Sequence, residues 1–261
     1  MAVMVVVLGS SANAEAARPG QRCVAPAAFP SFAPSLRRTA RRLAHSEPLT
    51  VVAIGSSSTA GAGASSSAAA YPARLEAALK AHFPTISIRV LNRGVNGEEI
   101  PQMLARLDRD VVAEKPDLIL WQLGTNAIMR DHDVSAEAPL LQEGLERLKS
   151  TGADIVLIDP QFAPKVIAKP EAEHMVELIA ASAKLESVGL FNRFALMRDW
   201  HDVRGVPFDA FLAPDGLHLN DWSYDCVANL LATSIIDAAT RVPMTAGAAP
   251  SVLGVPTIQQ H

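Results

Sequence analysis

The sequence predicts an α/β fold of three layers, in which helices cover both faces of a central parallel sheet of about five strands. Short apolar runs alternate along the chain with longer amphipathic segments, which is the pattern of strands joined by helical crossovers. The run at 118–121 is apolar throughout, as a strand covered on both faces must be. With 261 residues, 49% of them hydrophobic and 19% charged, the chain has ample apolar residues for a single core.

The predicted elements follow one another along a single domain, 49–241. An extended arm rich in alanine and proline precedes it in the segment 15–48 and ends in a short basic helix, 35–46. The expected strands are 49–54, 86–91, 117–123, 154–158 and 188–191. The expected helices have apolar residues at helical spacing and are 67–82, 98–114, 137–150, 171–187 and 221–240. The remaining segment, 242–261, is rich in proline, alanine and glycine and is expected to be disordered.

The N-terminal segment favours export. A short apolar run that ends in Ala12-Asn13-Ala14 is typical of a secretory signal peptide at 1–14, although its positively charged n-region is missing. We therefore expect a periplasmic or secreted protein. The alternative is a buried first strand at 3–8 in a cytoplasmic protein. No later segment reaches about 18 uninterrupted apolar residues, so no integral membrane span is expected.

Charge and cysteine content restrict the function further. The formal net charge of −4 argues against nucleic acid as a partner. The basic patch at 37–42 is interpreted as a solvated helix face rather than a phosphate or membrane site. Cys23 and Cys226 are compatible with one disulfide in an oxidising compartment, or with two unpaired buried thiols. Neither has the neighbours of a structural zinc site.

Candidate functional residues follow the ends of the predicted strands, because active sites of parallel sheets form at the carboxyl ends of the strands. Four loops there carry polar or glycine-rich sequence: 55–59, 92–97, 124–126 and 213–220.

These loops hold the residue types of serine acyl transfer, which needs a nucleophile, a base, an acid that fixes the base, and oxyanion donors. Asp215 and His218 are spaced so that the carboxylate can reach the imidazole across a tight turn. Gly94 offers a backbone N–H without an obstructing side chain, and Asn126 offers an amide NH₂.

At these places the sequence resembles the SGNH hydrolase superfamily, also called GDSL-type esterases, over about residues 50–240. The segment 55–61 resembles the first block of that family, and Thr59 and Gly61 fix the register so that Ser57 is the nucleophile. The other blocks resemble 92–94, 124–126 and 215–218. The resemblance implies the flavodoxin-like fold of that superfamily. One residue departs from the pattern, since Ser56 stands where the family has aspartate.

The resemblance also implies the roles of the residues. Ser57, Asp215 and His218 would form the catalytic triad, and Ser57, Gly94 and Asn126 the oxyanion hole. The reaction would be ester hydrolysis through an acyl-enzyme, with no metal and no organic cofactor.

Each of these residues also has an ordinary structural interpretation. Ser57 would serve as a helix N-cap, Gly94 as a turn residue, Asn126 as a loop bridge, and Asp215 with His218 as a surface pair. Their occurrence together, in order, favours catalysis. Of the remaining candidates, the run 131–133 (Asp-His-Asp) could ligate a metal but is interpreted as a polar loop. His82 is interpreted as a helix-terminal residue that complements the helix dipole, and His174 and His201 lack a partner at triad spacing.

For the substrate, export and a low aromatic content of 5% favour a small acyl group, such as acetyl on a cell-envelope or extracellular glycan. Partners are therefore expected to be small-molecule or glycan esters. One alternative is a lipase, lysophospholipase or thioesterase that acts on longer acyl chains. Another is a non-catalytic, glycan-binding module of the same fold.

Overall fold

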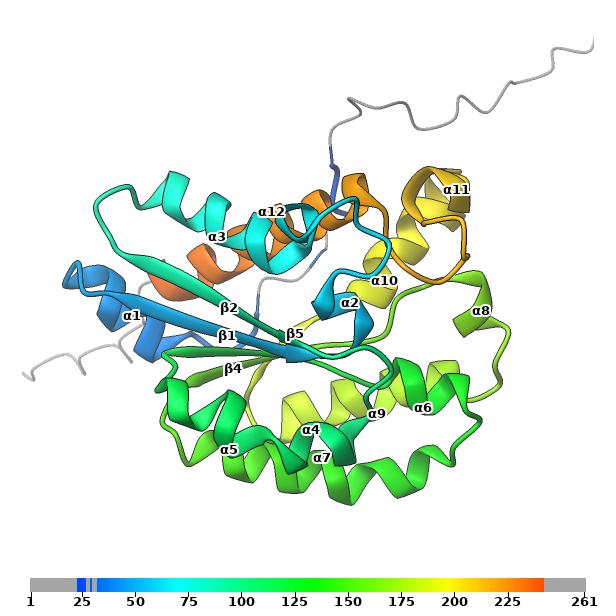
Figure 1. Cartoon of the computed structure of the whole chain (residues 1–261), viewed down its shortest axis with the longest axis horizontal. Helices are drawn as coiled ribbons and strands as arrows, with labels where there is room; N and C mark the ends of the chain where they lie inside the picture. The colour runs from blue at the N-terminus through cyan, green and yellow to red at the C-terminus, as the bar shows by residue number, and fades with distance from the viewer. Residues whose placement is uncertain (1–22, 27–28, 30–31, 242–261) are drawn as a thin grey trace, which may run out of the picture.

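The computed structural model describes residues 23–26, 29 and 32–241 (Figure 1). The predicted signal peptide, 1–14, and the predicted tail, 242–261, lie outside the described residues. Among those that are described, no helix combines the length and the apolar character needed to cross a bilayer.

A parallel sheet of five strands forms the centre of the molecule, as predicted, in the order β2-β1-β3-β4-β5. Its strands are β1 (Leu49–Gly55), β2 (Ile88–Gly94), β3 (Leu118–Gln122), β4 (Asp154–Ile158) and β5 (Gly189–Phe191). All four pairings between neighbours are parallel. This order is the flavodoxin-like one, and the chain reverses direction across the sheet between β1 and β3. A crevice at that switch point is where such sheets bind ligands.

Helices cover both faces of the sheet (Figure 1). One face carries α1 (Arg37–Ala44), α3 (Tyr71–His82) and α12 (Asp221–Thr240), which pack against one another or against β2. The opposite face carries α4 (Ile100–Ala105), α7 (Val134–Lys149) and α9 (Ala172–Leu185). The predicted three-layer architecture is therefore confirmed.

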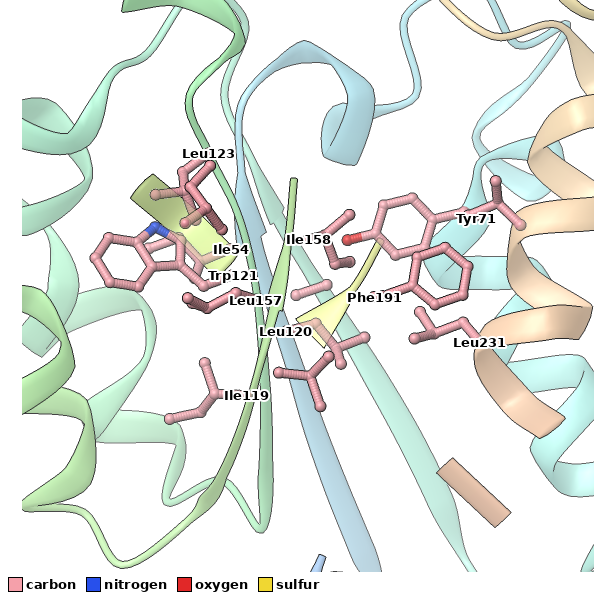
Figure 2. Close-up of a cluster of buried hydrophobic side chains, with 14 of the residues drawn as sticks. Ile54, Tyr71, Ile119, Leu120, Trp121, Leu123, Leu157, Ile158, Phe191 and Leu231 are labelled. Carbon is pink, nitrogen blue, oxygen red and sulfur yellow. The ribbon is translucent and has the colours of Figure 1, made fainter. Parts of the chain in front are cut away.

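Two apolar layers hold these helices to the sheet, because successive residues of a strand point to opposite faces. Figure 2 shows Ile119 and Trp121 on one side of the strands, and Leu120 beside Tyr71 and Leu231 on the other. All five are buried.

The helix predicted at 98–114 is broken into α4, α5 (Leu107–Asp110) and η2 (Val112–Glu114). Arg106 lies at the first break with φ −113° and ψ 6°. Its guanidinium is buried and binds Glu98 and Asp110, and it donates to the carbonyl of Gly55 at 3.3 Å. Of these contacts, the one with Gly55 reaches the sheet, at the carboxyl end of β1.

The helix predicted at 67–82 is divided into η1 (Ser67–Ala69) and α3. Several other short elements were not predicted. They are α2 (Ser57–Ala60), α6 (Thr125–Met129), α8 (Pro164–Ile167), α10 (Arg193–Arg198), η3 (Asp199–Val203) and α11 (Phe208–Phe211). Most follow the carboxyl end of a strand, and two of them, α2 and α6, carry predicted site residues.

The basic helix α1 is fixed to the edge of the sheet that lies away from the predicted site. Its Arg38 and Arg42 donate from Nε to Asp117 Oδ1 at 2.8 and 2.9 Å, just before β3. Asp117 Oδ2 accepts the N–H of Thr50 at 3.0 Å. Two of the four arginines in the predicted basic patch therefore bind a buried carboxylate of the same chain.

A disulfide joins Cys23 of the N-terminal arm to Cys226 of α12, with a Cα–Cα distance of 5.3 Å. Of the two alternatives left open by the sequence, the structure therefore has the bonded pair.

Candidate active site

The predicted site residues gather at the switch point of the sheet. Ser57 is the first residue of α2, immediately after β1, and Asn126 lies in the first turn of α6, after β3. Since β1 and β3 are neighbours in the sheet, their carboxyl ends place the two residues on one side of the molecule. Asp215 and His218 reach the same place from the loop that precedes α12.

Ser57, His218 and Asp215 form a continuous hydrogen-bonded line. Ser57 Oγ lies 2.8 Å from His218 Nε2. The other ring nitrogen, Nδ1, lies 2.5 Å from Asp215 Oδ2. A carboxylate can only accept, so Nδ1 donates to Asp215, and in that tautomer Nε2 faces the serine hydroxyl as an acceptor. The predicted grouping of serine, histidine and aspartate is present in the structure.

The loop that carries the acid and the base is closed by its own backbone. Ala213 donates its N–H to the carbonyl of His218 at 2.8 Å, and Gly216 takes a left-handed conformation with φ +62°. Asp215 Oδ1 accepts the backbone N–H groups of Leu217 and His218 at 3.0 and 2.9 Å. These bonds orient the carboxylate toward the imidazole before any substrate arrives.

The charge of Asp215 is favoured by the same contacts. Partial burial raises the pKa of the carboxyl, but the hydrogen bonds from the His218 side chain and from the backbone of His218 and Leu217 outweigh burial, and the net pKa lies below its ordinary value. Asp215 is therefore an anion at neutral pH and can stabilise a positive charge on His218.

Two of the predicted oxyanion donors face the site. The N–H of Ser57 opens α2, so it has no acceptor within the helix. Asn126 Nδ2 donates one hydrogen to the carbonyl of Glu98 at 2.8 Å, which fixes the amide plane and leaves its second N–H for a substrate.

Gly94, the third predicted donor, ends the edge strand β2. Val95 donates its N–H to Gly55 on β1 at 3.0 Å, so the preceding N–H, that of Gly94, points to the outer edge of the sheet. There it donates to Asn92 Oδ1 at 2.9 Å. Gly94 as an oxyanion donor stays a prediction, and this orientation argues against it.

The structure gives Gly94 a steric role instead. A Cβ at this position would lie 2.1 Å from the backbone nitrogen of Ala60 and 2.6 Å from the carbonyl carbon of Thr59. Only glycine lets α2, which carries Ser57, pack directly on the end of β2.

Ser56, the residue that departs from the family pattern, is buried against Gln122 of β3. Gln122 Oε1 accepts the N–H of Ser56 at 3.0 Å, its hydroxyl at 3.1 Å, and the hydroxyl of Thr59 at 3.2 Å. A glutamine on the central strand thus holds the turn around Ser57. Gln122 was not among the predicted site residues. Its polar side chain at the end of an apolar run (118–123) is unusual, but the sequence does not show what it binds.

A second buried polar side chain, Gln161, connects two parts of the site and was also missed. Its Oε1 accepts from Thr125 Oγ1 and from Arg193, each at 3.0 Å. Its Nε2 donates to the carbonyl of Leu217 at 3.2 Å. Gln161 therefore links the residue before Asn126 to the residue before His218.

His201, which lacks a partner at triad spacing, has a structural role. It stacks on Phe208 with ring centroids 3.8 Å apart, and its Nδ1 lies 3.0 Å from the carbonyl of Val206. Trp200 is buried nearby and packs on Trp222 and Phe211.

Comparison with known proteins supports an esterase-like family. The family model described as "Non-GDSL lipase-like family" matches residues 22–241. An acetylxylan esterase of Geobacillus stearothermophilus is 32% identical over 90 residues, which cover 33% of this chain and 39% of that protein. The matched segment thus spans well under half of that relative.

Solved structures resemble the fold. An acetylxylan esterase from Geobacillus stearothermophilus, Axe2, aligns with a TM-score of 0.61 and 22% identity over 72% of this chain and 94% of that one. Two further structures of it are catalytic mutants, with alanine replacing a serine and a histidine. A two-domain esterase active on acetylated mannans aligns with a TM-score of 0.69 and 17% identity over 87% of this chain and 59% of that one. Since the family model matches nearly the whole described chain, this protein belongs to the non-GDSL lipase-like family.

Proposed function

We propose that this protein is a serine esterase that removes short acyl groups, acetyl above all, from a cell-envelope or extracellular glycan. The observation that carries the proposal is the line from Ser57 Oγ through His218 to Asp215, with contacts of 2.8 and 2.5 Å. A serine with a purely structural role, such as a helix cap, does not require a histidine whose tautomer is fixed by a carboxylate.

In the proposed mechanism His218 Nε2 takes the proton of Ser57 as Oγ attacks the ester carbonyl. Asp215 stabilises the resulting imidazolium. The imidazolium then protonates the alcohol oxygen of the substrate, the C–O bond breaks, and the acyl group remains on Ser57. Water, deprotonated by His218, attacks the acyl carbonyl. The bond from the acyl carbon to Ser57 Oγ then breaks, Oγ takes the proton from His218, and the acid leaves. No step needs a metal or an organic cofactor.

The oxyanion of each tetrahedral intermediate would accept from the N–H of Ser57 and the free N–H of Asn126. For a third donor we favour Gly97 over Gly94. Gly97 has φ +78° and no acceptor for its N–H among the described residues. It directly precedes Glu98, whose carbonyl binds Asn126.

Support for a glycan ester comes from the relatives and from the openness of the site. The similar esterases act on acetylated xylan or mannan by their descriptions. The side chain of Asp215 is 43% exposed and that of His218 is 16% exposed. A triad that lies at the surface leaves room for a bulky alcohol part.

We also assign the protein to the SGNH superfamily as a variant without the usual aspartate. The shared hydrogen bonds of Ser56 and Thr59 to Gln122 would support the nucleophile turn in place of that carboxylate.

Export remains part of the proposal. The disulfide between Cys23 and Cys226 is the kind of bond that persists in an oxidising compartment. N-terminal sequencing of the protein recovered from periplasm or medium should begin at Glu15. Recovery only from the cytosol, with residues 1–14 still attached, would contradict export.

Two activity experiments test the enzyme and its acyl preference. A fluorophosphonate should label the wild-type protein and leave folded Ser57→Ala unlabelled; an unlabelled wild type would favour a binding module. A chain-length series of p-nitrophenyl esters should give its highest kcat/KM at acetate. A rate that rises beyond about eight carbons would overturn the acetyl preference and favour a lipase or thioesterase.

A further inference from the structure

Next to the candidate active site, two carboxylates and an imidazole converge from three separate elements. Glu99 is the N-cap of α4, His132 follows α6, and Glu137 lies in α7. One potential ligand atom from each lies within 4.8 Å of the other two. Glu99 and Glu137 are buried, whereas His132 is exposed to solvent.

The cluster has an unbalanced negative charge. Glu99 Oε1 pairs with Arg130, and Glu99 Oε2 lies 3.3 Å from His132 Nδ1. Glu137 has no such cation. Its Oε1 lies 3.9 Å from His132 Nδ1, and its Oε2 has no hydrogen-bond partner among the described residues. The side chain of Glu137 is only 5% exposed, and burial of a carboxylate without a full set of partners is costly.

Glu137 therefore lies buried beside a second carboxylate, Glu99, with the exposed imidazole of His132 3.9 Å away. A buried carboxylate in this position needs either a proton or a cation.

The two acids that flank His132 in sequence are already engaged. Asp131 Oδ2 accepts from Lys169 at 2.6 Å. Asp133 caps α7 by accepting the N–H of Ser135 at 2.8 Å. The polar-loop interpretation of 131–133 therefore holds for both aspartates, and His132 alone points toward the buried pair.

We propose that Glu99, His132 and Glu137 form a binding site for a divalent transition-metal ion, with zinc as the cation that fits this donor set best. One imidazole nitrogen and two carboxylate oxygens are ordinary zinc ligands. Bonds of about 2.1 Å place ligand atoms roughly 3.4 Å apart in a tetrahedral site. His132 Nδ1 already lies 3.3 Å from Glu99 Oε2 and 3.9 Å from Glu137 Oε1, close to that spacing. The side chain of His132 is 45% exposed, so the imidazole has room to adjust to an ion.

The ion would connect the loop before α4 to the end of α6, the two segments that the hydrogen bond from Asn126 to Glu98 also joins. Glu99 directly follows Glu98, whose carbonyl accepts from Asn126, and His132 follows α6, which carries Asn126. Bound metal would thereby hold the loop before α4 against the end of α6. Its role is to fix the segment that positions Asn126, and it is separate from the chemistry at Ser57.

The experiment is a metal titration of the untagged protein after treatment with a chelator. Titration with zinc chloride in a calorimeter should show one ion bound per chain, and cobalt(II) should give the visible bands of a low-symmetry site with nitrogen and oxygen ligands. Saturating zinc should raise the Tm by several degrees, because an ion that binds only the native state stabilises it. None of these readouts depends on ester hydrolysis.

Two substitutions test whether the ion binds at these residues. His132→Ala and Glu137→Gln should each weaken zinc binding by at least about tenfold. Glu137→Gln should fold, because it replaces a carboxyl that burial already disfavours as an anion. The matched control is His174→Ala, which removes a histidine that is 66% exposed and pairs with Glu171 elsewhere on the surface. The proposal is overturned if the wild type binds neither ion, or if both variants bind zinc as tightly as the control does.

Discussion

The side-chain amide of Asn126 is oriented so that one of its N–H groups can bind an oxyanion. The carbonyl of Glu98 takes one hydrogen of its amide and so fixes the direction of the other. We predict that Asn126→Ala lowers kcat on p-nitrophenyl acetate by about 10²–10³-fold, as expected for loss of one oxyanion donor. KM should change much less, because this donor acts mainly in the transition state. A kcat within a few-fold of wild type, in a variant with unchanged Tm, would remove Asn126 from the mechanism.

Asp159 gives a second prediction at the level of one residue. It is fully buried, and burial raises the pKa of its carboxyl to about 7. The native carboxyl keeps its proton up to about that pH, whereas in the unfolded chain it ionises near pH 4. The native state is therefore penalised increasingly as pH rises from about 4 to 7, and the full penalty applies above pH 7.

The variant Asp159→Asn lacks this titration. Between pH 5 and pH 8 its free energy of unfolding should gain about 2–3 kcal/mol relative to wild type, at about 1.4 kcal/mol for each pKa unit. Urea unfolding of both proteins at the two pH values measures the difference. Equal pH dependence in the two proteins would show that Asp159 does not carry the shift.

The contrast between predicted and missed residues follows from sequence distance. Asp215 and His218 were predictable because a carboxylate and an imidazole three residues apart can meet in one turn. Gln122 and Gln161 were not, because their partners lie 66 and 56 residues away in Ser56 and Leu217. The Glu99–His132–Glu137 cluster was missed for the same reason, since only the packing of α4, α6 and α7 brings its members together.

At the scale of elements, Gln161 connects the end of β4 to α6, α10 and the loop before α12. We predict that Gln161→Leu, which preserves side-chain size, lowers the free energy of unfolding by about 1–3 kcal/mol because buried partners lose their hydrogen bonds. The rate on p-nitrophenyl acetate should fall at least about tenfold, since the loop that carries His218 is no longer tied to α6.

A conservative variant separates loss of stability from loss of positioning. Gln161→Glu keeps the oxygen that accepts from Thr125 and Arg193, and it loses the N–H that binds Leu217. If that bond positions the loop, kcat should fall in Gln161→Glu as well. Wild-type kcat in this variant would limit Gln161 to a role in stability.

Whether a segment forms a helix or a strand was predictable where its apolar residues followed one clear spacing. The residues at which the elements begin and end were less predictable. The strand predicted at 86–91 occupies Ile88–Gly94, because its pairing with β1 extends to the Gly55–Gly94 step. The helix predicted at 98–114 breaks at Arg106, whose side chain binds the carbonyl of Gly55 on another element. Apolar spacing contains no information on such a contact. Conversely, α12 matches its prediction at both ends, and Asn220 caps it by accepting the N–H of Ser223.

At the scale of the whole molecule, the disulfide links the N-terminal arm to the final helix across 203 residues. We predict that the double variant Cys23→Ala/Cys226→Ala loses about 2–4 kcal/mol in free energy of unfolding, chiefly because its unfolded chain is less constrained. Denaturant unfolding with and without a thiol reductant measures the effect. The reductant should lower the stability of the wild type to that of the variant and leave the variant unchanged.

The overall architecture was the most predictable level. Alternating strands and helices restrict the chain to a parallel sheet covered on both faces, and the order β2-β1-β3-β4-β5 agrees with the flavodoxin-like fold that the resemblance implies. The structure adds how the arm at Cys23 and helix α1 are held, through the bond of Cys23 to Cys226 and the contacts of α1 with Asp117.

The position of that bond also sets an order of events during synthesis. Ribosomes add about 5–20 residues per second, so the 203 positions that separate the cysteines take on the order of 10–40 s to translate. During that interval Cys23 is a free thiol without its partner. Because the chain contains only two cysteines, no wrong intramolecular pairing exists. The disulfide can therefore close only after the chain has been synthesised as far as Cys226 in α12.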